Sequence, residues 1–448
     1  MNMDGKTEKL KIACIGAGSA GTGHMVRMEK YLPGSCVAFS DVDRSKFDKI
    51  VAGYLGDGNM ALAGDLKSEP FELRRSFKDL PYYLDPEEML QKEDINTVII
   101  ASFCSHHAEA VALCVRHGVN ILLEKPIAIT EADVCKVWTL LRDYQKVATV
   151  NFSLRGSPVA ESARRHIRNG DIGRIVSVQF VNNVHYGDIY FRAWMRTRKN
   201  VGSLLLQKGT HDLDLINYFI GLKPEAVAAF GSRQVYGGDM PDDLTCDVCD
   251  RKMTCTMSIY RRKLDAGKPL LPPELRRCVY AREIDIDDNQ VLAIKYEGGV
   301  TASYSQTFNA PFSGGQRGGY FIGTEGILDF RLYGEFEEHP DTGAFVKGTS
   351  TIRITRFNDK PGSSLVETHD WANVGHMGSS EYLALGLIKL LQGGESHINA
   401  NIRDGYISAM MCLAAEKSIK TEQMVKLNLD TLGGNPSARD YLSKMASH

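Results

Sequence analysis

The stretch KIACIGAGSAG, residues 11–21, is an apolar run that stops at three glycines spaced as G-x-G-x-x-G, and a helical pattern follows over residues 21–32. At a junction between strand and helix, the first glycine permits a tight turn, the second lets a pyrophosphate approach the backbone, and the third allows close packing. The N–H groups that open the helix then bind the phosphates. The candidate cofactor residues of this turn are Gly16, Gly18, Ser19, Ala20 and Gly21. A tight turn that binds nothing is the alternative interpretation.

Short apolar runs alternate with helical patterns through the first 150 residues. The apolar runs lie at residues 11–18, 35–43, 95–103, 120–126 and 147–153. Strands this apolar, separated by helices, are typical of a parallel sheet that is covered on both faces. The sequence therefore predicts an α/β, doubly wound (Rossmann) domain over residues 1–150.

Asp41 ends the second apolar run, 25 residues after Gly16. A carboxylate at this place in the motif accepts hydrogen bonds from the adenosine ribose hydroxyls and repels a 2′-phosphate. We therefore expect NAD in preference to NADP. Arg44 follows closely and would offset part of that repulsion. A solvated carboxylate at a strand end is the alternative interpretation of Asp41.

From about residue 170 the sequence changes to alternating strand patterns, which are joined by turn signals such as EGG and GTEG. The clearest lie at residues 173–186, 290–308 and 318–334, and a helical pattern that ends in glycine interrupts them at 210–221. Alternation of this kind predicts a large, mostly antiparallel sheet. We expect a C-terminal α+β domain over residues 151–448, with a charged, irregular excursion at 261–290.

The composition of the 448 residues is that of an ordinary globular protein, with 43% apolar and 24% charged residues. A chain of this length is too long for one hydrophobic core, so two domains are the default. The formal net charge of −2 and the lack of a long basic block argue against a nucleic-acid partner. We find neither a secretory signal nor an apolar run long enough to span a membrane, and we expect a cytoplasmic protein with reduced thiols.

The segment EKPIAIT, residues 124–130, together with residues 101–123 and 209–221, resembles the glucose-fructose oxidoreductase/inositol dehydrogenase/rhizopine-catabolism (Gfo/Idh/MocA) family. The resemblance covers nearly the whole chain and includes residues 375–382 and 414–427. It implies a Rossmann domain, a C-terminal open sheet that often forms the interface of a homo-oligomer, a dimer or a tetramer, and a nicotinamide cofactor in the cleft between the two domains.

The resemblance also implies which residues carry the chemistry: Lys125 of the E-K-P motif, His211, and Asp214 one helical turn later. Oxidising a hydroxyl needs a proton acceptor, a hydride acceptor and a group that stabilises the alkoxide. His211 is the expected base, NAD the hydride acceptor, and Lys125 the cation that holds the substrate oxygen. Asp214 would orient the imidazole or contact the substrate. Without the resemblance, a histidine that opens a helix is more often a cap or a core residue.

The chain departs from the family where many members carry an aspartate four residues before the histidine. Gln207 and then Lys208 stand there. Glutamine cannot carry negative charge, and an inward-pointing Lys208 would disfavour the protonated imidazole. This puts the family's usual proton relay in doubt. The resemblance adds further cofactor candidates, which are Ser102, His107, Glu124 and Lys125.

Candidate substrate contacts come from the segment YGDIYFRAWMRTRK, residues 186–199. Its aromatic and basic residues suit stacking on a polyhydroxylated ring and hydrogen bonding to it. The full set of candidates is Tyr186, Tyr190, Trp194, Arg196, Gln207, Lys208 and His376. An aromatic-rich segment is as often part of a core.

Four cysteines, Cys246, Cys249, Cys255 and Cys278, fall in one charged region that begins as C-x-x-C. Four thiolates can hold a structural zinc, which is one hypothesis for this region. The second pair is not a C-x-x-C, so separate thiols without metal are the alternative.

The sequence thus favours an NAD-dependent dehydrogenase that acts on a secondary hydroxyl of a sugar, a sugar derivative or a cyclitol. The closest alternative is a redox-neutral glycosidase that keeps its NAD, oxidises C3 of a sugar transiently and eliminates the aglycone. In that case Tyr186 or Tyr190 would be the additional acid or base. A non-catalytic NAD-binding regulator is disfavoured because both Lys125 and His211 are present.

Overall fold

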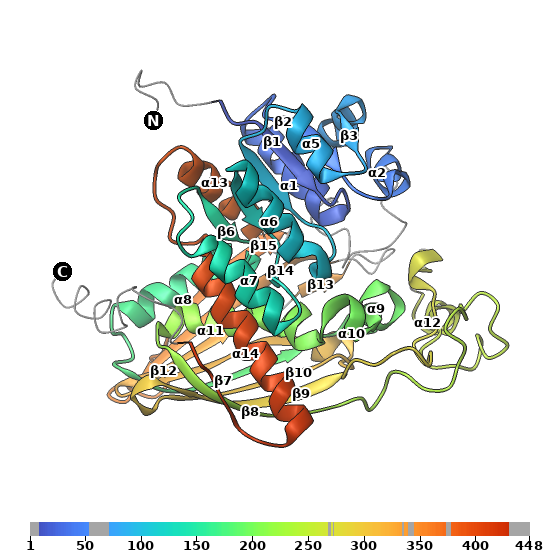
Figure 1. The fold of residues 1–448 in the computed structure, drawn as a ribbon. Coiled ribbons are helices and arrows are strands. Elements are labelled where there is room, and N and C mark those ends of the chain that lie inside the picture. Colours follow the sequence, from blue (N-terminus) through green and yellow to red (C-terminus); the bar gives the residue numbers. More distant parts are fainter. Residues whose placement is uncertain are drawn as a thin grey trace.

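We describe the protein from a computed structural model of the chain. The described residues are 9–52, 71–267, 270–271, 273–333, 336–338, 345–372 and 378–429. They form two layered parts, a sheet of mostly parallel strands between helices and a broad sheet with helices on one face (Figure 1). The fold class expected from the sequence is therefore confirmed.

The first sheet has seven strands in the order β16-β6-β5-β4-β1-β2-β3. Six of them are parallel, and β16 runs antiparallel to β6. The strands are β1 (Ile12–Ile15), β2 (Cys36–Ser40), β3 (Tyr82–Tyr83), β4 (Thr97–Ile100), β5 (Asn120–Leu123), β6 (Ala148–Val150) and β16 (Ala400–Asn401). The strand order reverses between β1 and β4, and in such sheets ligands bind beyond the carboxyl ends of the strands at this point.

The helices of this domain begin and end at residues suited to the purpose. Asp43, Asp85 and Thr130 each cap a helix by accepting a hydrogen bond from a backbone N–H of the first turn. Gly118 ends a helix in the left-handed conformation. The helices are α1 (Ser19–Tyr31), α2 (Arg44–Val51), α4 (Phe71–Ser76), α5 (Pro86–Lys92), α6 (His107–His117) and α7 (Glu131–Leu141).

The second sheet follows the order β13-β14-β12-β11-β7-β10-β9-β8-β17, and β15 pairs with β14. All pairs are antiparallel except β7 with β10. Buried and exposed side chains alternate along the strand β9, so one face of the sheet is covered. The strands are β7 (Ile175–Asn183), β8 (Pro224–Ser232), β9 (Asn289–Tyr296), β10 (Thr301–Thr307), β11 (Gln316–Gly323), β12 (Gly326–Arg331), β13 (Phe336–Glu338), β14 (Phe345–Arg356), β15 (Leu365–Ala372) and β17 (Val425–Lys426).

Three helices, α8 (Pro158–Arg168), α11 (Thr210–Ile220) and α14 (Ile402–Thr421), lie between the two sheets (Figure 1). The helix α14 packs on β8, α11 and α7, and therefore joins both domains. The chain then returns to the first domain: α13 (Ser379–Leu391) packs on α1, and β16 extends the first sheet. The domain boundary expected near residue 150 stays a prediction. The returning segment of α13 and β16 also packs on the first domain, although it lies far beyond that boundary in the sequence.

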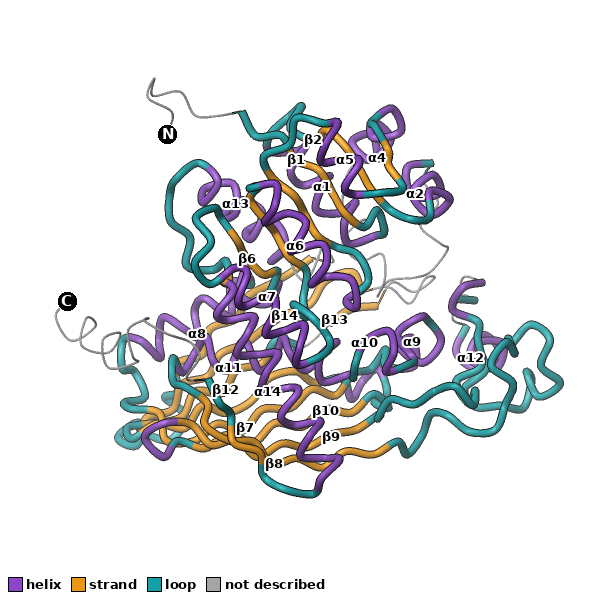
Figure 2. The backbone as a smooth tube through the Cα atoms, in the orientation of Figure 1, coloured by secondary structure: helices purple, strands orange, loops and turns teal. Residues whose placement is uncertain are grey.

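The described residues of the segment 233–288, between β8 and β9, form an irregular excursion that contains α12 (Ile259–Ala266). Figure 2 shows this part mainly as loop, at one side of the large sheet. It packs against α9 (Asp188–Arg192) and α10 (Arg198–Val201) through a third core cluster, which includes Phe191, Tyr236 and Leu275. The excursion expected at 261–290 is thus present and begins earlier.

Candidate active site

The three glycines of the opening motif have different surroundings. Gly16 has φ +99°, and a Cβ atom there would lie 2.4 Å from the carbonyl carbon of Ala101. A Cβ atom on Gly21 would lie 2.0 Å from the carbonyl oxygen of Gly16. A Cβ atom on Gly18 would meet no atom of the described residues within 4 Å. The fold itself therefore requires the outer two glycines, whereas the middle one faces open space where a ligand can approach.

Helix α1 begins directly after this turn, with Gly18 as its N-cap residue. No side chain caps the helix, and its first turn contains no acidic residue. Ser19 and Ala20 belong to that turn; Ser19 is partly buried and Ala20 is exposed. The N–H groups at this end remain available, and together with the helix dipole they suit a phosphate group. These features fit the pyrophosphate of a dinucleotide.

Asp41 lies beside the glycine turn, immediately after β2. Its Oδ2 atom accepts a hydrogen bond from the backbone N–H of Ala17 (2.8 Å), and its Oδ1 atom accepts one from Asp43 (3.1 Å). Arg44 instead contacts Asp48 (3.4 Å) and lies over the ring of Tyr82. The carboxylate is thus fixed at the strand end where a ribose is expected.

The Glu124 carboxylate lies at the carboxyl end of β5 and joins three segments. Its Oε1 atom contacts His24 Nε2 (2.8 Å) and accepts a hydrogen bond from Asn151 Nδ2 (2.7 Å). Burial alone would raise its pKa, but the contacts with His24 and Asn151 and the charge of Lys125 lower the pKa of Glu124 to about 2. Glu124 therefore stays ionised and holds α1, β5 and β6 together.

Lys125 extends from the first domain to the second. Its Nζ atom donates a hydrogen bond to the carbonyl oxygen of Gln207 (2.9 Å). Burial lowers the pKa of Lys125, and the charge of Arg317 adds to this effect, while Glu124 opposes it. The ammonium group thus lies next to the segment that leads into α11.

That segment, η5 (Leu205–Gly209), is one turn of π-helix. Such turns are rare and concentrate at functional sites. The Gln207 amide also contacts Cys104 Sγ (3.5 Å) and Met195 Sδ (3.8 Å). His211 follows in the first turn of α11, with only 5% of its surface exposed, and its ring meets Phe152 edge-on. The structure therefore brings Lys125 together with the turn that precedes His211.

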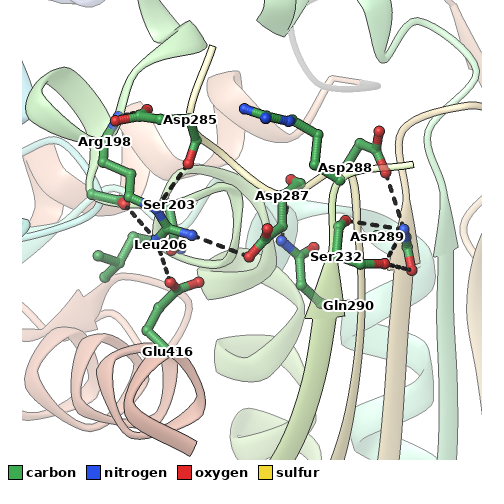
Figure 3. A network of polar contacts seen from close by, with 12 residues as sticks. Arg198, Ser203, Leu206, Ser232, Asp285, Asp287, Asp288, Asn289, Gln290 and Glu416 are labelled. Carbon is green, nitrogen blue, oxygen red and sulfur yellow. Dashed lines mark hydrogen bonds and ion pairs between the residues drawn. The ribbon is translucent and has the colours of Figure 1, made fainter. Parts of the chain in front are cut away.

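A polar network holds the approach to this π-turn in place (Figure 3). Arg198 of α10 forms ion pairs with Glu416 of α14 (2.5 Å) and with Asp287 (3.1 Å), which precedes β9. Its Nε atom also donates to the carbonyl oxygen of Asp285 (2.9 Å). The Ser203 hydroxyl accepts a hydrogen bond from the N–H of Leu206 (3.2 Å), the second residue of the π-turn. These contacts anchor α10, which precedes η5, to α14 and to the segment before β9.

Asp214 lies in a buried ion pair with Arg155. The guanidinium group donates to both carboxylate oxygens, from Nε (2.8 Å) and Nη2 (2.6 Å), and its Nη1 atom contacts Asp404 of α14 (3.1 Å). Burial alone would lower the pKa of Arg155, but the two carboxylates raise it. These contacts tie α11 to η3 (Ser153–Gly156) and α14, which gives Asp214 a positioning role. Its expected part in catalysis stays a prediction.

Removal of this guanidinium should cost stability. We expect Arg155→Met to lower the free energy of unfolding by about 3–5 kcal/mol, because it leaves Asp214 buried without its partner. Urea unfolding measures the effect. The control is Arg142→Met, since Arg142 pairs with Asp143 at the surface and should change stability by less than about 1 kcal/mol. Equal effects of the two substitutions would contradict the positioning role.

Lys208 points into the same region. Its Nζ atom donates a hydrogen bond to the Tyr186 hydroxyl and lies 5.0 Å from the centre of that ring. Burial and the charge of Arg317 lower the pKa of Lys208 to about 7. Arg317 in turn donates from Nε to Asp212 Oδ1 (2.6 Å). The site thus contains three cationic side chains from different elements.

Comparison with known proteins agrees with this geometry. Residues 10–152 match the family "Oxidoreductase family, NAD-binding Rossmann fold", and residues 160–329 match the "GFO/IDH/MocA C-terminal domain". The chain belongs to the GFO/IDH/MocA family. Among the described helices, none combines the length and the apolar character that crossing a membrane requires.

Two relatives and one solved structure illustrate the range of the GFO/IDH/MocA family. YteT of Bacillus subtilis is 32% identical over 51% of this chain and 59% of its own length. The 2,7-anhydro-N-acetylneuraminate hydratase of Mediterraneibacter gnavus is 24% identical over 35% of this chain and 41% of its own. The chain thus spans about half the length of these curated relatives. A levoglucosan dehydrogenase in complex with NADH and levoglucosan shares the fold, with a TM-score of 0.66, 19% identity, and coverage of 94% of this chain and 100% of that one.

The other candidate residues of this GFO/IDH/MocA member fall in different places. His107 is buried, and its ring contacts the carbonyl oxygens of Pro126 (2.8 Å) and Ser102 (3.1 Å), so it joins two loops beside the glycine turn. Tyr190 stacks on Tyr186 with ring centres 6.3 Å apart. Trp194 packs on Phe103, 4.7 Å away, across the two domains. The last candidate, His376, lies outside the described residues.

Arg196 points to the excursion. Its Nη2 atom donates to the carbonyl oxygen of Asp242 (2.6 Å) and contacts Glu283, and its Nη1 atom donates to the carbonyl oxygen of Cys278 (3.4 Å). The side chain is only 1% exposed. These contacts hold residues 233–288 in place, and substrate contact by Arg196 stays a prediction.

The structure does not support the zinc hypothesis. All four cysteines are free and line one small cavity of about 20 Å³. Yet the described residues include no group of three or more His, Cys, Asp or Glu that could hold a metal ion.

Sequence reasoning missed Arg155, Asp212, Arg317 and Tyr333, all of which surround the candidate site. Asp212 stands next to His211, and this was the one available signal. Its oxygens accept hydrogen bonds from Arg317, Asn182 (2.7 Å) and Tyr304 (2.7 Å). No local pattern connects these residues, because each bond joins distant parts of the chain.

Proposed function

We propose that this protein is an NAD-dependent oxidoreductase that oxidises a secondary hydroxyl of a sugar, a sugar derivative or a cyclitol by hydride transfer. The observation that carries the proposal is the bond from Lys125 to Gln207. It brings a cation from the E-K-P segment next to the turn that precedes His211, at the domain whose glycine turn suits a dinucleotide. The named activity of the levoglucosan dehydrogenase, which shares this fold, is of the same class.

Each residue of the candidate site has a separate role in the proposed oxidation. Bound NAD supplies the hydride acceptor. His211 takes the proton of the hydroxyl, and Lys125 holds the same oxygen and stabilises its negative charge. Asp214, through Arg155, keeps α11 and therefore His211 in position. Buried surroundings strengthen the electrostatic part of this arrangement.

The fixed Asp41 carboxylate supports NAD rather than NADP, because it would meet the 2′-phosphate of NADP with a like charge. We place the protein in the cytoplasm, where its ten cysteines, all free in the structure, remain thiols.

A homo-oligomer, a dimer or a tetramer, would use the outer face of the second sheet. Exposed apolar side chains lie on three strands of this sheet: Phe230 (73% exposed) and Val291 (47%) on the adjacent strands β8 and β9, and Tyr320 (39%) on β11. Such residues favour association through a sheet face.

The function is tested by mixing the purified protein with NAD and a panel of monosaccharides, inositols and aryl glycosides. We expect NADH absorbance to rise with one or more of the free polyols, and NADPH to form more slowly when NADP replaces NAD. Tight NAD binding without reduction by any member of the panel would instead support a regulator.

A redox-neutral glycosidase is the second candidate, and the bond between Lys208 and Tyr186 favours it. A phenol beside an amine whose pKa is about 7 provides a second acid or base in addition to His211. The measurement that separates the two candidates is aglycone release from aryl glycosides. Release without accumulation of NADH would identify the glycosidase.

A further inference from the structure

The candidate site has an unusual balance of charge. Lys125, Lys208 and Arg317 come from the loop after β5, from the π-turn and from β11. All three are buried or partly buried, and Lys208 and Arg317 are 8% and 2% exposed. Burial and mutual repulsion both disfavour the charged lysines. Three cationic side chains that lie close together and are largely shielded from water would be stabilised by a bound anion.

The carboxylates of the protein balance only part of this positive charge. Asp212 pairs with Arg317 through Nε and binds two neutral partners with its remaining capacity. Glu124 is held by His24 and Asn151. Among the described residues, no carboxylate lies within ion-pair distance of Lys208, whose hydrogen-bond partner is the neutral Tyr186. One positive charge at Lys208 is thus left for a ligand.

Arg317 gives a second, independent sign of a missing partner. Its Nη2 atom is buried and has no hydrogen-bond partner among the described residues. The neutral hydroxyl of Tyr333 hydrogen-bonds to the same guanidinium group, and Tyr186 and Lys208 lie close to it, so the group faces the side of the site where Lys208 lies. Buried guanidinium N–H groups are normally paired, and an unpaired one requires an explanation.

We infer that the substrate carries a carboxylate, which binds Lys208 Nζ and Arg317 Nη2, while its hydroxyl meets Lys125 and His211. The inference rests on the proposed function, whose substrate class it narrows to acidic sugars. A carboxylate presents two oxygens in one plane, which suits one ammonium and one guanidinium N–H. A phosphate ester would bring close to two negative charges, whereas only the positive charge of Lys208 is left unpaired here.

The proposed contact couples binding to pH. The groups that face Lys208 are Tyr186, Tyr333, Arg317, Asp212 and Lys125. In the free protein the pKa of Lys208 is about 7, and a bound carboxylate would raise it. The charged lysine prevails below that pKa, so carboxylate binding should be strongest in mildly acidic solution. It should weaken as the pH rises above about 7.

The test measures binding to the NADH-loaded protein by calorimetry, which needs no turnover. The probes are D-glucuronate and D-galacturonate, with D-glucose, D-galactose and the methyl esters of the two uronates as neutral matches and glucose 6-phosphate as the phosphate match. We expect at least one uronate to bind about 30-fold or more tightly than its neutral matches. Equal binding of acid and ester, preference for the phosphate, or no uronate binding at all would overturn the inference.

Two variants localise the effect. Lys208→Met should reduce that uronate preference by about 30-fold and remove its pH dependence, whereas Lys146→Met, at an exposed lysine of the first domain, should change neither. An undiminished preference in a folded Lys208→Met protein would overturn the inference. Uronate binding without NADH production from any sugar would contradict the proposed oxidation instead, and turnover of neutral sugars without uronate preference would contradict only the carboxylate.

Discussion

Replacing Lys125 by methionine or His211 by alanine should each lower kcat/KM by about 10²–10⁴ while NAD remains bound. Methionine keeps most of the length of the Lys125 side chain but cannot stabilise the negative charge that develops on the substrate oxygen. Alanine at position 211 leaves no group to take the hydroxyl proton. The two side chains act on one oxygen, so the double variant should lose much less than the product of the two factors.

Steady-state kinetics with the best substrate of the panel measures these losses, and NAD binding is followed by calorimetry on the same preparations. Lys136→Met on α7 and His397→Ala are matched controls, because Lys136 is exposed and the His397 side chain is 62% exposed. A His211→Ala protein of full activity would refute the assigned base. Loss of NAD binding together with activity would show that the residue supports the cofactor rather than the reaction.

The sequence was sufficient to predict the first domain because its signals are local. The apolar runs that become β1 and β4 are buried at every position, which is what a sheet covered on both faces requires. The glycine motif marks the turn between β1 and α1, and its two outer glycines are required by the immediate backbone. The sequence did not predict that the returning segment of α13 and β16 belongs to this domain, because the segment joins it from about 250 residues further along the chain.

The charged part of the candidate site could not be predicted in the same way. Arg155 and Asp214 are 59 residues apart, and Arg317 and Asp212 are 105 apart. A single sequence contains no signal for such pairs, because nothing local distinguishes a buried arginine from an exposed one. The fold brings them together by packing η3 on α11 and by pairing β11 with β7, from which Arg317 and Asn182 both reach Asp212 of α11.

The π-turn shows a different limit of sequence reasoning. Helical periodicity predicts the helix over residues 210–221 but cannot predict the wider turn before it, since the apolar spacing of α-helix and π-helix differs by less than the pattern itself varies. That turn places the carbonyl group of Gln207 against Lys125 and directs Lys208 toward Tyr186. Positions 207 and 208, where we expected the chain to depart from its family, are thus where the substrate would be selected.

The second large effect concerns the cofactor. Gly18→Val should weaken NAD binding by about 100-fold or more and leave the fold intact. Gly18 has φ −73° and ψ −172°, an extended conformation that valine adopts readily, and its Cβ atom would meet nothing within 4 Å among the described residues. The new side chain would instead occupy the space that the pyrophosphate needs and keep it from the N–H groups of α1. Each of these groups would otherwise donate a charge-assisted hydrogen bond to the pyrophosphate.

Gly21→Ala is the matched variant. We expect it to lower the stability of the fold, whereas Gly18→Val should lower NAD binding and leave the fold intact. Alanine inside a helix would ordinarily gain about 1 kcal/mol over glycine. Here its Cβ atom would lie 2.0 Å from the Gly16 carbonyl oxygen and 2.7 Å from Cys14 Sγ, so backbone must shift and we expect a net loss of about 1–3 kcal/mol. Thermal unfolding and NAD calorimetry on both variants distinguish the two effects. A Gly18→Val protein that binds NAD normally would show that the glycine turn is structural, and the proposed cofactor site would have to be abandoned.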